Sequence, residues 1–544
     1  MRFAGGGLRW REITRDRPGA LLTLGMCAVL VVVLFWTVPH YGFHCDEPIY
    51  ELATRRIEQW LQQPLNGVFS AESIDRFWKV YPEFNVHPSG LKWLNVAAHR
   101  LWGGSVSEPL HQDRFMVVLF FSLSLLLFLR TLFPDRPLYL FLVPLLLLSQ
   151  PRFFAQSHFA VTEMPMIGAL LLVWAAWLRF FHTPWFWLLC PLFGFFWSVK
   201  LTCWVLSGVL VALLLVSGDL PWRRAIPRLA VVLAGAALVF YLLNPDYWFD
   251  PFGRLSEFLH QSLTRSQWTP ISLQYFGTVY TNRGPWPYPF VMVGVTTPLL
   301  HLGLLLAGLA MTPWWRRPEW RKKLPIVVMG FFMVFFMLLP VSPMHDSERY
   351  LLPGYPLLAV IMAWGAERLY RFVRESRAGL RKRALAVALT VALAVGVFRV
   401  GSAFATYHPH ELSYYNEIVG GVRGAERKGL EVSYLMDVVG PGLIERLNTD
   451  CAGRGVYFVF PYQPLLMVML NEEGRLRFLP TLVPTGIHFV AVYGRPSTRF
   501  WMEHLPRTIP PGLDLYLLWQ ECVDGVPIFQ LYGIRRTGAA VLRT

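Results

Sequence analysis

Long runs of apolar residues, separated by shorter polar segments, occupy most of the first 404 residues of the chain. Most runs are about 20 residues long, the length of helix that crosses the hydrocarbon core of a bilayer. A few are shorter or contain proline, such as Pro144, Pro191 and Pro298. The pattern predicts about eleven membrane-spanning helices, at residues 19–39, 115–133, 137–151, 161–179, 184–199, 201–217, 229–243, 289–311, 325–341, 350–368 and 384–404.

Four polar pieces fall on one side of the predicted membrane. The first, 40–114, has apolar residues at helical spacing over 46–63, which predicts a helix lying on the membrane surface. The second, 149–163, is short, and the third, 244–288, is rich in aromatic residues, proline and arginine. The fourth is the C-terminal region, which is less hydrophobic and carries no span.

The C-terminal region combines strand and helix patterns. The runs GVYFVF, GIHFVAVY and PIFQLYGI are typical of strands, and GLIERLN is typical of a helix. We therefore expect an α-helical polytopic membrane protein, with a transmembrane domain at 1–404. A small extracytoplasmic α/β domain at 405–544 should follow it.

Composition and charge agree with a membrane protein. The chain is 54% hydrophobic, above the roughly 45–50% typical of soluble domains, and its mean hydropathy is +0.40. The net charge of +15 would suit nucleic acid. The basic residues, however, cluster in short segments that eleven spans would place on one side, which the positive-inside rule assigns to the cytoplasm. These segments lie at 9–17, 222–228, 314–323 and 371–383.

Charge distribution therefore predicts a multi-pass membrane protein with no nucleic-acid partner. Its N-terminus should be cytoplasmic and its C-terminal domain external. The six cysteines show no metal-ligand spacing. Cys451 and Cys522 both lie in the external region, where the sequence is compatible with either a disulfide or two free thiols.

Ionisable residues gather at the external boundary of the membrane, where such groups are costly and usually functional. Each also has a simpler explanation. Asp46 suits a helix N-cap, and Glu163 suits the first turn of an apolar helix. Lys200 could extend to lipid head groups, and Arg349 could pair only with its acidic neighbours. A lone histidine such as His87 is more often a structural hydrogen-bonding residue than a ligand.

Seven segments stand out in chain order. They are DEPIYE (46–51), NVHPSGLKWL (85–94), PRFFAQSHFAVTEMP (151–165), KLTCW (200–204), NPDYWFDPFGRL (244–255), HDSERYLLPGYPLLAV (345–360) and YHPHELSYYNEIVGGVRGAE (407–426). In this order they resemble motifs of the GT-C membrane glycosyltransferases. The resemblance is to the bacterial family 39-like branch, which is related to protein O-mannosyltransferases and the lipid A aminoarabinose transferase. The chain departs from the pattern in Glu163, where Asp is usual, and in YLM (434–436), where a Tyr-Trp pair is common.

The resemblance implies a hexosyl or pentosyl transferase of the bacterial inner membrane that uses a polyprenyl-phosphate sugar donor and a lipid, glycan or protein acceptor outside the cytoplasm. Transfer would proceed with inversion. Asp46 would be the general base that removes the proton of the acceptor hydroxyl. Glu47 and Glu163 would orient hydroxyl groups. Positive side chains would bind the leaving phosphate, and the candidates are His87, Lys200 and Arg349. Arg265 and Arg283 are weaker candidates.

Two questions stay open at the level of sequence. Asp46 and Glu163 could hold a divalent cation such as Mg²⁺ or Mn²⁺, because carboxylate oxygens suit these ions.

The alternative functions are a transporter or flippase for polyprenyl-linked sugars and a noncatalytic scaffold. A transporter favours polar residues at the bilayer midplane and internal repeats, whereas this sequence has acids at one face and no visible repeat.

Overall fold

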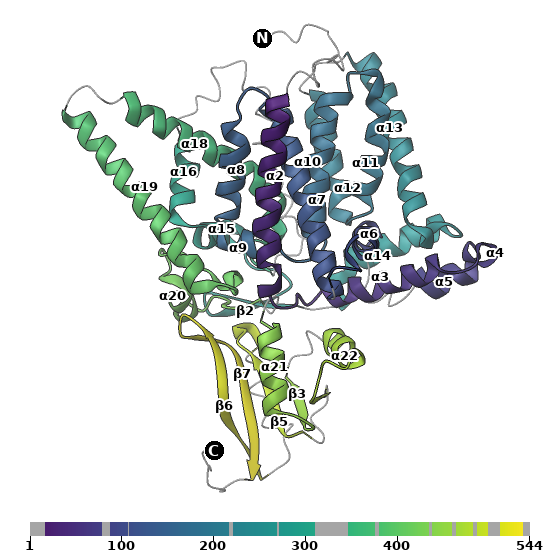
Figure 1. The fold of residues 1–544 in the computed structure, drawn as a ribbon, viewed down its shortest axis with the longest axis vertical. Helices are drawn as coiled ribbons and strands as arrows, with labels where there is room; N and C mark the ends of the chain where they lie inside the picture. Colours follow the sequence, from purple (N-terminus) through teal and green to yellow (C-terminus); the bar gives the residue numbers. More distant parts are fainter. Residues whose placement is uncertain are drawn as a thin grey trace.

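The structure, a computed structural model, has a body of upright helices with a sheet region beneath it (Figure 1). It describes residues 17–78, 87–106, 108–216, 221–268, 271–310, 346–375, 380–434, 438–459, 464–481, 487–498 and 512–536. The helical body and the C-terminal sheet confirm the predicted fold class. The predicted count of eleven spans stays a prediction, because residues 325–341 lie outside the described part of the chain.

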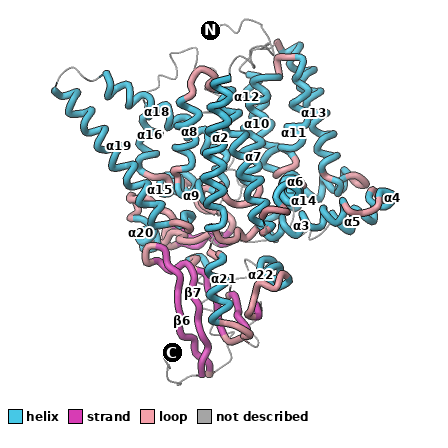
Figure 2. Tube along the Cα trace, viewed as in Figure 1, coloured by secondary structure: helices cyan, strands magenta, loops and turns pink. Residues whose placement is uncertain are grey.

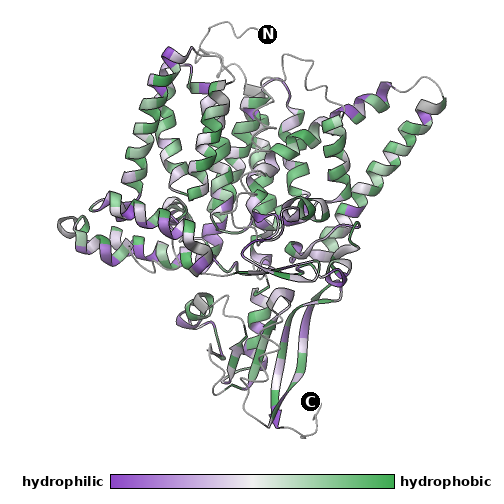
Figure 3. Ribbon diagram, turned by 180° about the vertical axis from the view of Figure 1, so that it is seen from behind, coloured by the Kyte–Doolittle hydropathy of each residue, from purple (hydrophilic) through white to green (hydrophobic). Residues whose placement is uncertain are grey.

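Within the described residues, five helices are long and apolar enough to cross a membrane, or six if a bent pair is counted as one span. The five are α2 (Arg17–Thr37), α7 (Pro109–Leu132), α10 (Glu163–Phe180), α13 (Trp222–Leu243) and α19 (Leu380–Tyr407). Shorter apolar helices stand among them, namely α8 (Leu138–Leu148), α11 (Leu189–Trp197) and α12 (Leu201–Val216). Hydrophobic residues predominate along the upright helices in Figure 3. Large apolar side chains are exposed on α2, α13 and α19, as expected of helices that face lipid.

Two predicted boundaries are wrong. Residues 289–311 do not form one straight span, because α15 (Tyr288–Thr296) and α16 (Leu299–Ala310) meet at a bend of 115°. Pro298 lies in the break, and proline disfavours a helical conformation in the residue before it. In addition, α7 begins at Pro109, so Arg114, expected in the external loop, lies inside this helix.

The helix predicted at 46–63 is confirmed as α3 (Glu47–Leu61), and its position on the membrane surface stays a prediction. With α4 (Leu65–Val68) and α5 (Ala71–Trp78), it lies across the lower ends of the upright helices in Figure 1. The inner face of α3 packs against α5 and α6 (Gly90–Trp102) through a separate apolar cluster. The α3 residues in this cluster are Ile57 and Trp60. Burial of this face fixes the rotation of α3, and hence the directions of its N-terminal acids.

Five strands form the C-terminal sheet in the order β4-β3-β5-β7-β6 (Figure 2). Strand β3 (Gly455–Phe458) runs parallel to β4 (Leu479–Thr481) and β5 (Phe489–Tyr493), and β7 (Val526–Arg536) is antiparallel to both β5 and β6 (Leu513–Val523). The three predicted strands and the predicted helix, α21 (Pro441–Asp450), are confirmed.

The long strand β6 was not predicted, because its side chains are mostly half-exposed and do not alternate cleanly between the two faces. Cys451 is buried after α21 and Cys522 is exposed on β6, and both are free thiols.

Glycines allow α16 and α18 (Tyr355–Glu375) to pack closely. A Cβ atom added to Gly308 would lie 2.2 Å from the carbonyl oxygen of Ile361. One added to Gly365 would lie 2.0 Å from the carbonyl oxygen of Leu304. Small residues of this kind are typical of helix contacts inside membranes.

We expect Gly308→Ala to lower the free energy of unfolding by about 1–3 kcal/mol, because the new methyl group forces α16 away from α18. Thermal unfolding in detergent would measure this loss. Gly303→Ala is the matched control on the same helix, since a Cβ there meets nothing within 4 Å, and it should be neutral or slightly stabilising. Equal effects of the two changes would contradict the close packing.

Candidate active site

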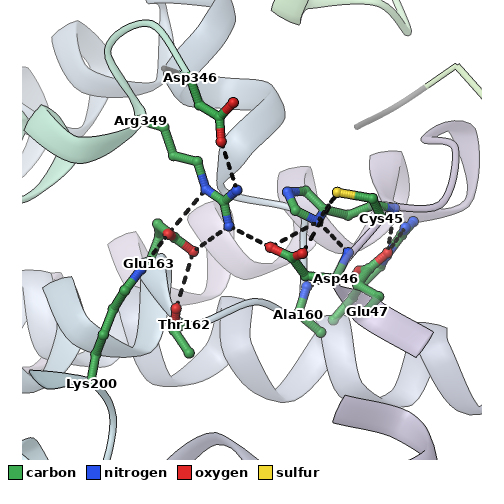
Figure 4. A network of polar contacts seen from close by, with 11 residues as sticks. Cys45, Asp46, Glu47, Ala160, Thr162, Glu163, Lys200, Asp346 and Arg349 are labelled. Atoms are coloured by element: carbon green, nitrogen blue, oxygen red, sulfur yellow. Dashed lines mark hydrogen bonds and ion pairs between the residues drawn. The ribbon is translucent and has the colours of Figure 1, made fainter. Parts of the chain in front are cut away.

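The guanidinium of Arg349 joins three carboxylates from distant parts of the chain (Figure 4). Arg349 is the first residue of η4 (Arg349–Gly354). Its Nε and Nη2 donate to the two oxygens of Glu163, at 3.0 and 3.2 Å. Nη2 also donates to Asp46 Oδ2 at 2.8 Å, and Nη1 donates to Asp346 Oδ2 at 3.3 Å. Charge-assisted bonds of this kind are the stronger hydrogen bonds in proteins, so Arg349 organises the whole group.

Glu163 brings a second cation to the same place. It is the first residue of α10, as predicted, and its Oε1 accepts a hydrogen bond from Lys200 Nζ at 2.9 Å. Lys200 lies in the break between α11 and α12. The Thr162 hydroxyl donates to the other oxygen of Glu163 at 3.3 Å. The buried Glu163 carboxylate therefore fixes the positions of two positive side chains.

Asp46 is the most accessible of the three acids around Arg349. Its side chain is 30% exposed, against 2% for Glu163 and 6% for Asp346. Asp46 occupies the N-cap position of α3, but its side chain makes no capping hydrogen bond there. The helix-cap explanation of this side chain is thus wrong, and its carboxylate is directed to Arg349 instead.

Glu47, the neighbour of Asp46, has a different environment. It is buried, and Arg114 donates to its two oxygens at 2.7 and 2.6 Å. The backbone N–H groups of His44 and Ala160 donate to the same carboxylate at 2.8 and 2.9 Å. Burial opposes ionisation of Glu47, but the charge and hydrogen bonds of Arg114 outweigh it and hold the pKa below its ordinary value. Glu47 therefore joins α3 to α7 and to the loop before α10.

Asn244 holds the segment that carries Lys200. Its Oδ1 accepts a hydrogen bond from the backbone N–H of Ser89 at 2.8 Å, and its Nδ2 donates to the hydroxyl of Ser198 at 3.0 Å. The N–H of Gly90 donates to the Ser198 carbonyl at 2.6 Å, and a Cβ on Gly90 would lie only 2.7 Å from that oxygen. The turn before α6 is thereby fixed against the break at Lys200.

Arg152, on α9 (Pro151–Gln156), supports the Arg349 segment from the other side. It is buried, and it donates to Ser347 Oγ at 2.9 Å and Glu348 Oε2 at 3.0 Å. Its guanidinium lies over the ring of Tyr415, 4.6 Å from the centroid. Arg152 and Arg114 were not among the predicted site residues, although a single arginine within or beside an apolar run is a usable signal of a buried ion pair.

The other predicted residues lie in other elements. His87 is in the turn before α6, where its carbonyl accepts a hydrogen bond from Lys92 Nζ at 3.1 Å and its ring stacks on Tyr50. Burial lowers the pKa of Lys92 to about 8, although Asp246 acts in the opposite direction. Arg283 lies two residues after the end of β2 (Thr278–Thr281). Arg265 lies in α14 (Pro251–Trp268), and its side chain is outside the described residues.

Asp46 and Glu163, which were predicted as possible ligands of a divalent cation, hold Arg349 between their carboxylates. A guanidinium in that position supplies the positive charge that a metal ion would bring, and it repels such an ion. His44, Cys45 and Asp46 form a separate group with ligand atoms within 4.8 Å of one another. Of the two acids predicted to bind a cation, Asp46 and Glu163, Asp46 also belongs to this second group of possible metal ligands.

Two kinds of solved structure resemble this one. ArnT from Cupriavidus metallidurans bound to undecaprenyl phosphate shares 16% identity and a TM-score of 0.48, over 96% of this chain and 99% of that chain. The Archaeoglobus fulgidus oligosaccharyltransferase tethered with an acceptor peptide shares 11% identity and a TM-score of 0.47, over 95% of this chain and 74% of that chain. No protein-family model and no curated protein matches the chain. At these TM-scores we take no function from the similarities and base the functional proposal on the residues of the site.

We expect Glu47→Gln to lower the free energy of unfolding by about 3–5 kcal/mol at pH 7, because it leaves Arg114 as a buried charge without its counterion. The folded pKa of Glu47 is below its ordinary value of 4.5, so the ion pair stabilises the fold above that pH. The stabilisation is lost as pH falls through the lower folded pKa. The difference between wild type and variant should therefore narrow below about pH 4.5.

Thermal unfolding in detergent at several pH values would measure this difference. Glu72→Gln, at an exposed position on α5, is the control and should unfold like the wild type. A pH-independent difference for Glu47→Gln would show that its charge is unimportant.

Proposed function

We propose that the protein is a membrane glycosyltransferase that moves a hexose or pentose from a polyprenyl-phosphate donor to a hydroxyl-bearing acceptor. One observation carries the proposal. An accessible carboxylate, Asp46, lies beside two cations that a buried acid, Glu163, holds in place, next to the ends of apolar helices. A lipid-linked sugar phosphate needs these features together, because its tail lies in the bilayer and its reacting bond lies at the boundary.

In the proposed reaction, Asp46 acts as the general base. As the acceptor oxygen bonds to the anomeric carbon, its proton passes to the Asp46 carboxylate. The bond from that carbon to the phosphate oxygen breaks, and polyprenyl phosphate leaves with the electron pair. A single displacement of this kind inverts the configuration at the anomeric carbon. The exposure of Asp46 supports this assignment, since the other two acids around Arg349 are buried.

Lys200 and Arg349 are proposed to bind the departing phosphate. The described contacts of Arg349 use Nε once, Nη2 twice and Nη1 once, which leaves one of its five N–H donors at Nη1. Lys200 donates to Glu163, and its contacts with described residues leave two of its three N–H donors for a ligand. Donors fixed in advance stabilise developing negative charge without reorganising, so Glu163 is a positioning residue in this scheme.

The proposal extends to partners and topology. A lipid, glycan or protein could present the acceptor hydroxyl, and the bilayer would hold the donor tail. The end of α18, the start of α19 and the start of α13 lie at the ends of the helices far from the sheet (Figure 1). These helix ends carry basic residues of the segments 371–383 and 222–228. This supports a bacterial inner-membrane protein with residues 1–404 as the catalytic domain and 405–544 as an extracytoplasmic domain.

We expect Asp46→Asn to reduce turnover about 100-fold or more, because Asn keeps the size of the side chain but cannot accept the proton. The assay would follow a radiolabelled polyprenyl-phosphate sugar in detergent, with a bacterial membrane extract as the source of acceptor. Thermal stability should change little, since the side chain is partly exposed and makes no capping bond.

Asp514→Asn, on β6 of the C-terminal sheet, is the control and should keep full turnover. Glu47→Gln should lose stability rather than chemistry. Near-normal turnover of a folded Asp46→Asn protein would refute the role of Asp46 as the base.

We expect Lys200→Met to weaken the binding of undecaprenyl phosphate about tenfold or more, since a hydrogen bond to a charged group typically contributes about 1.5–3 kcal/mol. Ligand-induced shifts in thermal unfolding would measure the affinity without any turnover. Arg179→Met removes an exposed cation near the other end of α10 and should leave binding unchanged. Equal affinities of wild type and Lys200→Met would remove Lys200 from the phosphate site.

A further inference from the structure

A second polar group lies where α3, α6 and α7 meet, apart from the cluster around Arg349. It consists of Glu51 from α3, His99 from α6 and Asp113 from α7. His99 Nε2 lies 3.4 Å from Glu51 Oε2 and 3.2 Å from Asp113 Oδ1. The ligand atoms of the three residues all lie within 4.8 Å of one another. Three helices therefore direct one nitrogen and two carboxylates to a common point.

These atoms are buried, and the ion pairs of His99 Nε2 with the two carboxylates are their contacts within the described part of the chain. Glu51 and Asp113 are 0% and 1% exposed. Glu51 Oε2, His99 Nε2 and both oxygens of Asp113 lack a hydrogen-bond partner there. A buried polar atom without a partner is costly, and a complete acidic side chain in this state is unusual. The group therefore points to a ligand that all three side chains share.

The separations match the ligand shell of a tetrahedral metal ion. Bonds of about 2.0–2.1 Å from zinc to nitrogen or oxygen place neighbouring ligand atoms about 3.3 Å apart in a tetrahedron. The two measured separations, 3.4 and 3.2 Å, lie on either side of this value. Imidazole nitrogen and carboxylate oxygen are both ordinary zinc ligands.

The surrounding residues also suit a metal site. Glu58 Oε1 lies 3.0 Å from His99 Nδ1, so the ring can donate its Nδ1 proton to Glu58 and present the Nε2 lone pair to the centre. Arg55 Nε donates to Glu51 Oε1 at 2.6 Å, which leaves Oε2 directed inward. Metal-binding histidines usually have such an outer carboxylate, which orients the ring.

We propose that Glu51, His99 and Asp113 bind a divalent transition-metal ion, with Zn²⁺ as the best match. Its place where three helices meet favours a stabilising role, with water as the fourth ligand of the tetrahedron. It joins α3 to α6 and α7 one helical turn beyond the Glu47–Arg114 pair, which sets the position of Asp46. Arg55, which pairs with Glu51, also pairs with Glu473 at 2.5 Å and so connects the proposed metal site to the C-terminal region. The site is independent of the proposed transferase activity.

The competing state has a proton in place of the metal. Burial lowers the pKa of His99, but Asp113 and Glu51 outweigh it and raise the value to about 11. A protonated His99 between two carboxylates would then form an ion-paired group that does not bind a metal ion. Metal binding must displace that proton, so the two states are distinguished by metal content.

The test uses the full-length protein in detergent, stripped with a chelator and then dialysed against Zn²⁺. Elemental analysis should find about one zinc per chain, and the unfolding temperature should rise with Zn²⁺ because the ion binds only the folded state. His99→Gln and Asp113→Asn should each reduce the bound zinc to less than about a tenth, since each removes one of three ligands. Glu58→Gln should weaken zinc binding about 10–100-fold, the usual effect of losing an outer carboxylate.

His260→Gln, an exposed position on α14, is the matched control and should bind zinc like the wild type. The proposal would be overturned, in favour of the protonated group, by either of two results. The wild-type protein would bind no more zinc than His99→Gln, or its unfolding temperature would not change with Zn²⁺. If either ligand variant fails to fold, wild-type stoichiometry and the Glu58→Gln affinity still decide the question. None of these measurements depends on turnover, so failure of the transferase proposal would leave them unaffected.

Discussion

Charges buried at the edge of an apolar helical body must be paired, and this constraint organises the molecule around Arg349. A buried ion without a partner costs several kcal/mol, whereas a guanidinium can satisfy several carboxylates at once through its planar array of donors. Arg349 does so for Asp46, Glu163 and Asp346, which come from segments up to 303 residues apart. The same pairing that stabilises the fold therefore brings the candidate chemistry to one point.

Neighbouring ion pairs and hydrogen bonds hold each of these segments in place. Glu47 and Arg114 fix the start of α3 against α7, and Arg152 with Glu348 fixes the start of η4. Asn244 fixes the break that carries Lys200. Because these partners are buried, they are unlike Asp46, whose carboxylate keeps access to a bound molecule. The buried residues therefore support the site, whereas Asp46 is the acid that would take part in the proposed reaction.

Much of the fold followed from local patterns. Apolar runs predicted the helical body, and alternating runs predicted β3, β5 and β7, because burial of one face imposes a period that the sequence carries. The bend at Pro298 and the strand β6 did not follow from these patterns. A proline permits a bend without fixing its angle, and a half-exposed strand needs no strict alternation. Both features depend on neighbours that pack against them in the folded chain.

The sequence by itself determined which ionisable residues lie next to the long apolar runs, and four of its predicted site residues, Asp46, Glu163, Lys200 and Arg349, do lie in one cluster. It assigned Glu47 to the orientation of hydroxyl groups, and no pattern around these two adjacent acids indicated that Glu47 pairs with Arg114 instead. Successive residues of a helix point about 100° apart, so the rotation of α3 decides which acid faces Arg349 and which faces Arg114. That rotation is set by packing of α3 against α6 and α7, and by pairing across long sequence separations. Only the tertiary structure contains this information, because no local pattern encodes the partner of a buried charge.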